Sequence, residues 1–226
     1  MSITGNLNLV RERIDAAAIR SGRKDSDITL VAVSKTWPVA DLCEAHSAGQ
    51  TVFGENRVQE LADKYVDLPH DVIWHLIGPL QKNKARKALA VMDCLESLDS
   101  LELAWSISRI AREMMRPPLS ALVQVNVAGD EAKSGFSEQT LRDALPELLA
   151  IPYLQIEGLM TIPNFDPDPE QSRRHFARLR EFRGELAAST GHPLPHLSMG
   201  MSHDYEVAIE EGATIVRVGS AIFGHR

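Results

Sequence analysis

Short apolar runs alternate with longer amphipathic segments along the whole chain. The apolar runs contain β-branched and bulky residues without polar alternation, as in strands that are buried on both faces. The first run, at 28–35, reads ITLVAVSK and has Lys35 at its carboxyl end. The same pattern predicts seven more strands, at 51–53, 72–77, 94–99, 120–127, 154–160, 195–199 and 214–219.

Helical periodicity fills the segments between these runs. An amphipathic helix precedes the first strand, and its apolar face contains Leu7, Val10, Ile14, Ala17 and Ala18. The last helix is predicted to begin at Ser202, with this serine as N-cap and two acids in the first turn. The other helices are predicted from Pro38 to Gly49, over 57–65, 81–90, 101–115 and 138–150, and from the loop at 163–169 to about Ser189.

Eight strands that alternate with helices in 226 residues favour a closed barrel over an open sheet. We therefore predict an α/β fold, a single (β/α)8 TIM barrel that spans residues 1–226 and has one extra N-terminal helix. In such barrels, catalytic and ligand-binding groups gather at the carboxyl ends of the strands. At these ends the sequence places Lys35, Asn56, 75–78, Asn126, Met160, 198–202 and 217–220.

Charge narrows the possible partners. Aspartate and glutamate outnumber lysine and arginine by 31 to 24, for a formal net charge of −7. Such an acidic chain is a poor match for broad nucleic-acid binding or for a polybasic membrane surface. The helix at 81–90 is basic, and we interpret it as a solvated face, with guidance of an anionic ligand as an alternative and nucleic acid as a weaker one. Its basic residues are Lys82, Lys84, Arg86 and Lys87.

Cysteine usage and the apolar runs indicate the compartment. Cys43 and Cys94 are far apart and lack metal-ligand spacing, so we expect small buried residues and no metal site. Unpaired cysteines fit a reducing compartment. The first residues lack the apolar core of a signal peptide, and no later run has the length of a membrane span. We expect a soluble, cytoplasmic protein without a membrane partner.

Two glycine and serine motifs follow the last two predicted strands, SMGMS at 198–202 and RVGS at 217–220. In barrels, the loops after strands seven and eight frequently bind phosphate. Gly200 and Gly219 would let the backbone approach an anion, and the hydroxyls of Ser198, Ser202 and Ser220 would donate to it. A phosphate site and a lysine at one barrel mouth suggest a phosphorylated aldehyde, because a neutral, partly desolvated lysine amine attacks a carbonyl to give a Schiff base.

Simpler interpretations of these residues stay open on the sequence alone. Lys35 by itself is a surface lysine that ends a strand, and the two glycines are turn residues. Asn56 is equally suited to cap the helix that begins at Arg57. Arg217 would form an ordinary ion pair with Glu210 or Glu211. His75 is more often a hydrogen-bonded core histidine than a ligand.

Six segments together resemble the pyridoxal phosphate homeostasis protein family. They are ITLVAVSKTWP, FGENRVQE, WHLIGPLQKNKARKAL, VQVNVAGDEAKSGF, IEGLMTIPNF and SMGMSHDYEVAIEEGATIVRVGSAIFGHR. They follow one another in order, and the resemblance extends over nearly the whole chain. The resemblance implies a fold-type III barrel similar to the amino-terminal domain of alanine racemases, with pyridoxal 5′-phosphate as cofactor. It also implies a part in cellular vitamin B6 homeostasis, without established enzymatic turnover.

The resemblance assigns a role to each site residue. Lys35 would hold the cofactor as a Schiff base, and Asn56 would lie near its phenolic oxygen. Arg217 would approach the pyridine nitrogen and, as a permanent cation, would leave that nitrogen neutral and the ring a weak electron sink. The residues that would bind or adjoin the phosphate are Ser198, Met199, Ser202, Gly219 and Ser220.

Three functions compete at this stage. The leading hypothesis is a carrier that stores pyridoxal phosphate or delivers it to recipient enzymes, and we expect it to be a monomer. The alternative is a racemase or related enzyme of small amino acids. Racemases of the related fold take a second base, a tyrosine, from a further carboxyl-terminal β-domain, and we expect this chain to lack one because its sequence ends at Arg226. The third is a regulatory module that binds another protein.

Overall fold

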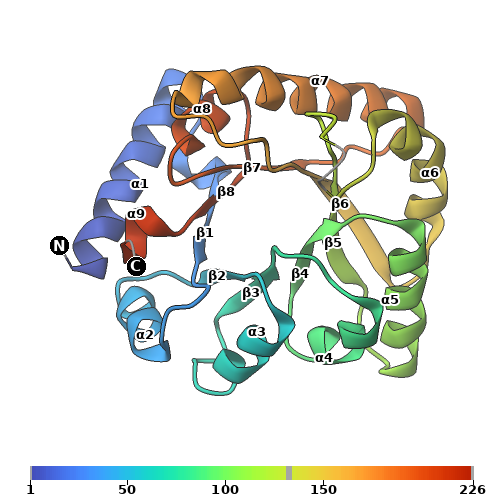
Figure 1. Cartoon of the computed structure of the whole chain (residues 1–226), viewed down its shortest axis with the longest axis horizontal. Helices are drawn as coiled ribbons and strands as arrows, with labels where there is room; N and C mark the ends of the chain where they lie inside the picture. The colour runs from blue at the N-terminus through green and yellow to red at the C-terminus, as the bar shows by residue number, and fades with distance from the viewer. Residues whose placement is uncertain (1, 131–133, 225–226) are drawn as a thin grey trace.

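Eight parallel strands close into a barrel in chain order, β1 to β8, and the pairing of β8 with β1 completes the ring. Figure 1 looks into this ring and shows the helices arranged around it. The structure is a computed structural model that describes residues 2–130 and 134–224. The predicted (β/α)8 barrel is therefore confirmed. The strands are β1 Thr29–Val33, β2 Val52–Glu55, β3 Ile73–Leu76, β4 Cys94–Leu98, β5 Leu119–Gln124, β6 Leu154–Met160, β7 His196–Met201 and β8 Ile215–Val218.

Most helices follow the predicted segments, with differences at their ends, but the short last helix at Ser220–Phe223 was not predicted. They are α1 Ile3–Arg20, α2 Val39–Ser47, α3 Val58–Tyr65, α4 Ala85–Leu89, α5 Leu101–Glu113, α6 Glu138–Ala150, α7 Arg173–Thr190, α8 Tyr205–Glu210 and α9 Ser220–Phe223. Short 3₁₀ helices cover Asp25–Asp27, Lys82–Lys84 and Pro169–Ser172. Within the described ranges, no helix is both long enough and apolar enough to cross a bilayer.

The extra helix α1 packs against α2, α8 and α9. The structure buries the apolar face that the sequence predicted for it, namely Leu7, Val10, Ile14, Ala17 and Ala18. In Figure 1 this helix and the red α9 lie side by side. The extra helix therefore covers the seam of the barrel, where the first and last strands meet.

The basic segment is not one helix as predicted. Its first part is the 3₁₀ helix Lys82–Lys84, and α4 has only five residues. Lys82 pairs with Glu102 and Arg86 pairs with Glu113, both on α5. These pairs support the interpretation of a solvated helix face, since exposed ion pairs of this kind are ordinary surface features.

The last predicted helix begins three residues later than expected, and Ser202 is not its N-cap. Asp204 precedes α8, and its carboxylate accepts a hydrogen bond from the Met201 amide at 2.8 Å. The Ser202 hydroxyl instead accepts from the amides of Gly219 and Ala221, at 3.1 and 3.3 Å. Serine and aspartate are both good N-caps, so local sequence does not decide between them. Ser202 thereby joins the loops that follow β7 and β8.

Two apolar cores support the barrel. The larger core lies between the strands and the helices and includes the ring contact of Phe53 with Trp74, whose centroids are 5.9 Å apart. A second buried cluster contains Val31, Leu122, Met160 and Ile215. Because side chains alternate between the two faces of a strand, this separate cluster fills the barrel interior. The interior of the barrel is therefore packed with side chains.

Candidate functional site

A cavity of about 670 Å³ opens at the carboxyl ends of the strands. Its volume lies within the range of small-molecule sites, which is about 300 to 1,000 Å³. The cavity brings together most of the residues that the sequence singled out. Its walls include Lys35, Asn56, Ser202, Arg217, Gly219 and Ser220.

Ser198 and Met199 do not line this cavity. The Ser198 side chain is fully buried, and its hydroxyl donates to Glu96 Oε2 at 2.6 Å while it accepts from Arg217. Met199 is fully buried in the apolar core between strands and helices. Both residues therefore lie behind the wall, and Ser198 adjoins the cavity only through Arg217.

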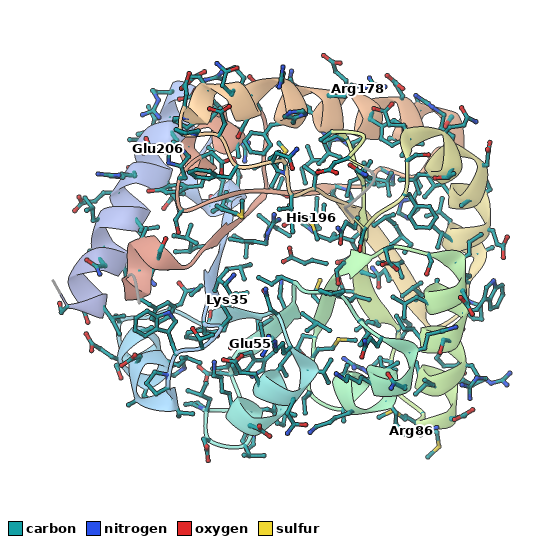
Figure 2. All side chains as sticks on the ribbon, in the orientation of Figure 1. Lys35, Glu55, Arg86, Arg178, His196 and Glu206 are labelled. Atoms are coloured by element: carbon teal, nitrogen blue, oxygen red, sulfur yellow. The ribbon has the colours of Figure 1, made fainter. Side chains whose placement is uncertain are left out.

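Lys35 follows β1 within a tight turn. The Trp37 amide donates to the Ser34 carbonyl at 3.0 Å, and Thr36 has a φ of 68°, as in a type II turn. Figure 2 shows Lys35 close to Glu55, near the ends of β1 and β2. The Lys35 side chain is exposed in the cavity mouth. The residue is therefore open to solvent on one side, and the expected partial desolvation of its amine stays a prediction.

A buried ionic group, which we call the rim cluster, lies outside the barrel wall between β1, β2 and α3. It contains Ser34, Glu55, Glu60 and Lys64. The Lys64 amine donates to Glu55 Oε1 at 2.6 Å, to the Ser34 carbonyl at 2.7 Å and to Glu60 Oε1 at 2.8 Å. The Ser34 hydroxyl donates to Glu55 Oε1 at 2.7 Å. Lys64 thus donates to two carboxylates and to the backbone carbonyl of the residue directly before Lys35.

The partners of Glu55 do not fully compensate for the burial of its carboxylate. Burial raises the pKa of Glu55, and the hydrogen bond and charge of Lys64 only partly oppose this effect. Among the described residues, its Oε2 atom is buried without a hydrogen-bond partner. The rim cluster therefore has too few donors to offset the effect of burial on the pKa of this acid.

A second group, which we call the barrel cluster, lies inside the barrel. It contains His75 from β3, Glu96 from β4, Ser198 from β7 and Arg217 from β8. His75 Nδ1 is 2.6 Å from Glu96 Oε1, and Arg217 Nη1 is 3.7 Å from Glu96 Oε2. Arg217 also donates from Nη2 to the Thr161 carbonyl at 2.9 Å. Four strands distributed around the ring are thereby joined through one carboxylate.

This geometry settles two alternatives from the sequence. Arg217 does not pair with Glu210 or Glu211 as an ordinary surface ion pair, because it is buried and faces Glu96. Those two acids bind other arginines, which are Arg20, Arg173 and Arg180. His75 is a hydrogen-bonded core histidine and does not line the cavity.

The barrel cluster has enough donors for its acid. Burial alone would raise the pKa of Glu96, but the hydrogen bond and charge of His75, the charge of Arg217 and the hydrogen bond from Ser198 together lower it. Burial lowers the pKa of Arg217, and the charges of Glu96 and Asp204 oppose this effect. Arginine keeps its proton in proteins. Arg217 is therefore a permanent cation on the cavity wall, and the buried Glu96 is its counter-charge.

Asn56 reaches the cavity because two loops touch. Helix α3 begins after Arg57 without a side-chain cap, so Asn56 is not the cap that the sequence allowed. A Cβ on Gly78 would lie 2.2 Å from the Asn56 carbonyl oxygen. Only glycine permits this contact, which sets the loop after β3 directly against the loop after β2. Asn56 lines the cavity in this position.

Gly200 and Gly219 differ in what they do. Gly200 has a φ of 90°, and a Cβ there would lie 2.5 Å from Ala208 Cβ, so packing of α8 requires this glycine. Gly219 lines the cavity, and its amide donates to Ser202. Since the Ser202 oxygen accepts two amide hydrogens, its own hydrogen is available to a ligand in the cavity.

The cavity suits a small molecule with a carbonyl and an anionic group. An amine, a guanidinium, three carboxamides and three serines gather on its walls, and Ile162, Phe165 and Met201 add apolar surface. In the part of the chain that the structure describes, no group of three His, Cys, Asp or Glu side chains is arranged to hold a metal ion. Sequence reasoning missed Glu55, Lys64 and Glu96. The signal for the two glutamates was a charge inside an apolar strand run, as in FGE and CLESL, whereas Lys64 lies on a helix and had no such signal.

Comparison with known proteins gives a consistent result. Residues 6–226 match the family model described as the alanine racemase, N-terminal domain. The chain is 43% identical over 227 residues to a pyridoxal phosphate homeostasis protein of Aquifex aeolicus, and the match covers 100% of this chain and 99% of that protein.

Two solved structures are similar over nearly the whole chain. A crystal structure of an unknown protein from Bifidobacterium adolescentis has a TM-score of 0.92 and 37% identity, and covers 98% of this chain and 94% of that one. PipY of Synechococcus elongatus, solved with pyridoxal phosphate bound, has a TM-score of 0.84 and 42% identity, and covers 95% of this chain and 100% of that one.

Proposed function

The chain belongs to the family of pyridoxal phosphate homeostasis proteins, and we propose that it binds pyridoxal 5′-phosphate through Lys35 and holds this reactive aldehyde without consuming it. The observation that carries the proposal is the state of Lys35 in the cavity. Within residues 2–130 and 134–224 its amine has no hydrogen-bond or ion-pair partner, although charged side chains surround the loop. An unpartnered lysine among polar donors is suited to a covalent ligand.

The other residues on the cavity wall fit the cofactor. Pyridoxal phosphate supplies an aldehyde that condenses reversibly with amines, and a ring that withdraws electrons when its nitrogen is protonated. The hydroxyls of Ser202 and Ser220 and the backbone at Gly219 would bind the phosphate, with Ser198 and Met199 supporting the loop from behind. Asn56 would donate to the phenolic oxygen.

Arg217 argues for retention of the cofactor over chemistry on it. Its guanidinium lines the cavity and is anchored by Ser198, the Thr161 carbonyl and the charge of Glu96. Placed at the ring nitrogen, a group that does not release its proton keeps that nitrogen neutral. The ring is then a weak electron sink, which disfavours carbanion chemistry.

The racemase alternative is less well supported. A two-base racemase needs a second acid–base group opposite the lysine. The described residues that line the cavity include no tyrosine. His203 also lines the cavity, but its Nε2 lies 3.0 Å from the Pro167 carbonyl oxygen, and its ring packs against Phe165 with centroids 5.3 Å apart. These contacts hold the imidazole to the loop after β6.

We further propose that residues 1–226 act as one cofactor-binding unit, that the protein is a cytoplasmic monomer, and that its partners are pyridoxal-phosphate-dependent enzymes that receive the cofactor. The acidic composition supports a cytoplasmic carrier without a nucleic-acid role. Incubation of the loaded protein with an apo-enzyme would test delivery, and recovery of that enzyme's activity is the expected result.

The absorption spectrum of the purified protein tests the proposal directly. We expect a band at about 400 nm after addition of pyridoxal phosphate, which borohydride treatment removes and which Lys35→Ala lacks. Asn8→Ala, at an exposed residue of α1 that does not line the cavity, is the control and should keep the band. A band that survives in Lys35→Ala, or amino acid racemisation at a substantial rate that Lys35→Ala abolishes, would contradict the carrier function.

A further inference from the structure

The residue after Lys35 has an unusual backbone conformation. Thr36 has a φ of 68°, in the left-handed region that glycine usually occupies. A β-branched residue there is a genuine outlier, because its Cβ substituents crowd the backbone. The hydrogen bond from Trp37 to Ser34 places Thr36 at the third position of the turn, where type II geometry requires a positive φ. Something must therefore hold this strained turn.

Two residues of α3 hold it from outside the barrel. The Thr36 amide donates to Glu60 Oε1, and that same oxygen accepts from the Lys64 amine at 2.8 Å. Lys64 also binds the carbonyl of Ser34, the first residue of the turn, at 2.7 Å. The first carbonyl and the third amide of the turn are thus fixed to one ion pair. An ordinary i,i+4 pair on a helix surface makes no such backbone contacts.

Relaxation of Thr36 would disturb Lys35. The common unstrained alternative is a type I turn, in which the φ of the third residue is negative and the ψ of the second differs by about 150°. The second residue here is Lys35. The peptide between these two residues would rotate, and the Thr36 amide would turn away from Glu60. The orientation of the Lys35 backbone at the cavity therefore depends on this hydrogen bond.

We propose that Glu60 and Lys64 are positioning residues that lock the Ser34–Trp37 turn in its strained form and so direct the Lys35 amine into the cavity. This inference rests on the proposed cofactor role of Lys35. Lys64 is almost fully buried, with 7% of its side chain exposed, so solvent does not compete for its three acceptors. Neither residue lines the cavity, and neither would touch the ligand.

The test compares Glu60→Ala, Thr36→Gly and the double variant by spectrophotometric titration with pyridoxal phosphate. Glu60→Ala should bind about tenfold more weakly, which corresponds to about 1.4 kcal/mol. Thr36→Gly alone should bind within about twofold of wild type, because glycine adopts a positive φ without strain. The double variant should recover most of the loss, since the turn no longer needs Glu60. Glu60→Gln, which keeps an acceptor oxygen, should bind nearly as wild type does.

A second readout needs no ligand. Amide hydrogen exchange at Thr36 should be faster in Glu60→Ala than in wild type, because the amide loses its acceptor. Asp63→Ala removes an equal charge from the exposed face of the same helix and is the matched control. It should change neither cofactor binding nor exchange at Thr36.

The outcomes separate the two proposals. If wild type fails to form the covalent link at Lys35, the proposed function is wrong. If wild type forms it and Glu60→Ala binds equally well, the positioning role is wrong and the function stands. Failure of Thr36→Gly to restore binding to Glu60→Ala, with both proteins folded by denaturant unfolding, would also overturn the positioning role.

Discussion

The two buried ionic clusters of this barrel use similar residues in opposite ways. Each is built around a fully buried glutamate on a strand, Glu55 in the rim cluster and Glu96 in the barrel cluster. Each glutamate accepts from a serine hydroxyl and faces a buried cation. Yet the pKa of Glu55 is raised and that of Glu96 is lowered. Burial is common to both, so the difference must come from the partners.

The number of donors for each acid explains the difference. Lys64 divides its charge between Glu55 and Glu60, and Glu60 itself raises the pKa of Glu55. Glu96 has no competing acid in its cluster and accepts from His75 and Ser198 while it faces Arg217. A buried carboxylate is kept ionised only by sufficient charge and hydrogen bonds. The barrel cluster meets this condition and holds the Arg217 cation in place. The rim cluster does not meet it, and its contacts hold the Ser34–Trp37 turn.

The largest effect is expected from Glu96→Gln. This change leaves Arg217 buried without its counter-charge, and breaking a buried ion pair typically costs about 3 to 5 kcal/mol. We expect a loss of unfolding free energy of about that size in urea denaturation. The loss should exceed that of any single substitution in the rim cluster.

A double variant separates the charge effect from packing. Replacing both partners, as in Glu96→Gln with Arg217→Met, removes the uncompensated charge and should be less destabilising than the sum of the two single changes. Strict additivity of the two free energies would show that Glu96 and Arg217 do not interact. In that case the contrast between the clusters would have another origin.

A smaller change in unfolding free energy is expected from Glu55→Gln, and its dependence on pH should be opposite to that of Glu96→Gln. Because burial disfavours the ionised form of Glu55, a neutral amide should be tolerated at pH 7, with a change in unfolding free energy of about 1 kcal/mol or less. The amide oxygen can still accept from Ser34 and Lys64. Urea denaturation across a pH series measures both the size and the sign.

The sign follows from the direction of each pKa shift. The folded pKa of Glu55 is raised, so its contribution to stability is full below the unfolded value of about 4.3 and is lost as pH rises through the folded pKa. The folded pKa of Glu96 is lowered, so its contribution is present above about pH 4.3 and is lost as pH falls through the folded pKa. The differences between wild type and the two glutamine variants should therefore change in opposite directions. Parallel curves would contradict the comparison.

The sequence revealed the frame of the site more readily than its electrostatics. Apolar runs without polar alternation located the strand ends, and with them Lys35, because a buried parallel strand has a pattern visible within a few residues. The partners of Arg217 were not predictable. They are Glu96 on β4, Ser198 on β7 and the Thr161 carbonyl after β6, which are far from Arg217 in the sequence and meet it only in the folded barrel. The positive φ of Thr36 had no local signal either, since the position lacks the glycine that usually marks it.

The smallest loss of stability is expected from breaking an ion pair on the surface. Such pairs contain the same residue types as the two clusters, but water surrounds them. Figure 2 shows Arg86 on the outer ring of helices, far from Lys35 and Glu55 in this view. Arg86 pairs with Glu113, and 57% of the Arg86 side chain is exposed. In water, the attraction between two such charges barely exceeds the entropy lost by ordering them.

We therefore expect the denaturation midpoint of Arg86→Ala to be indistinguishable from that of wild type, at both low and high salt. Salt weakens the attraction between exposed charges, with a screening length of roughly 10 Å at 0.1 M, so a real contribution of this pair would decrease as salt is added. A large, salt-sensitive loss in Arg86→Ala would mean that ion pairing alone stabilises this fold. A negligible loss of stability in Arg86→Ala, together with a large loss in Glu96→Gln, would assign the difference to burial. Both pairs join an arginine to a glutamate, and they differ in their access to water.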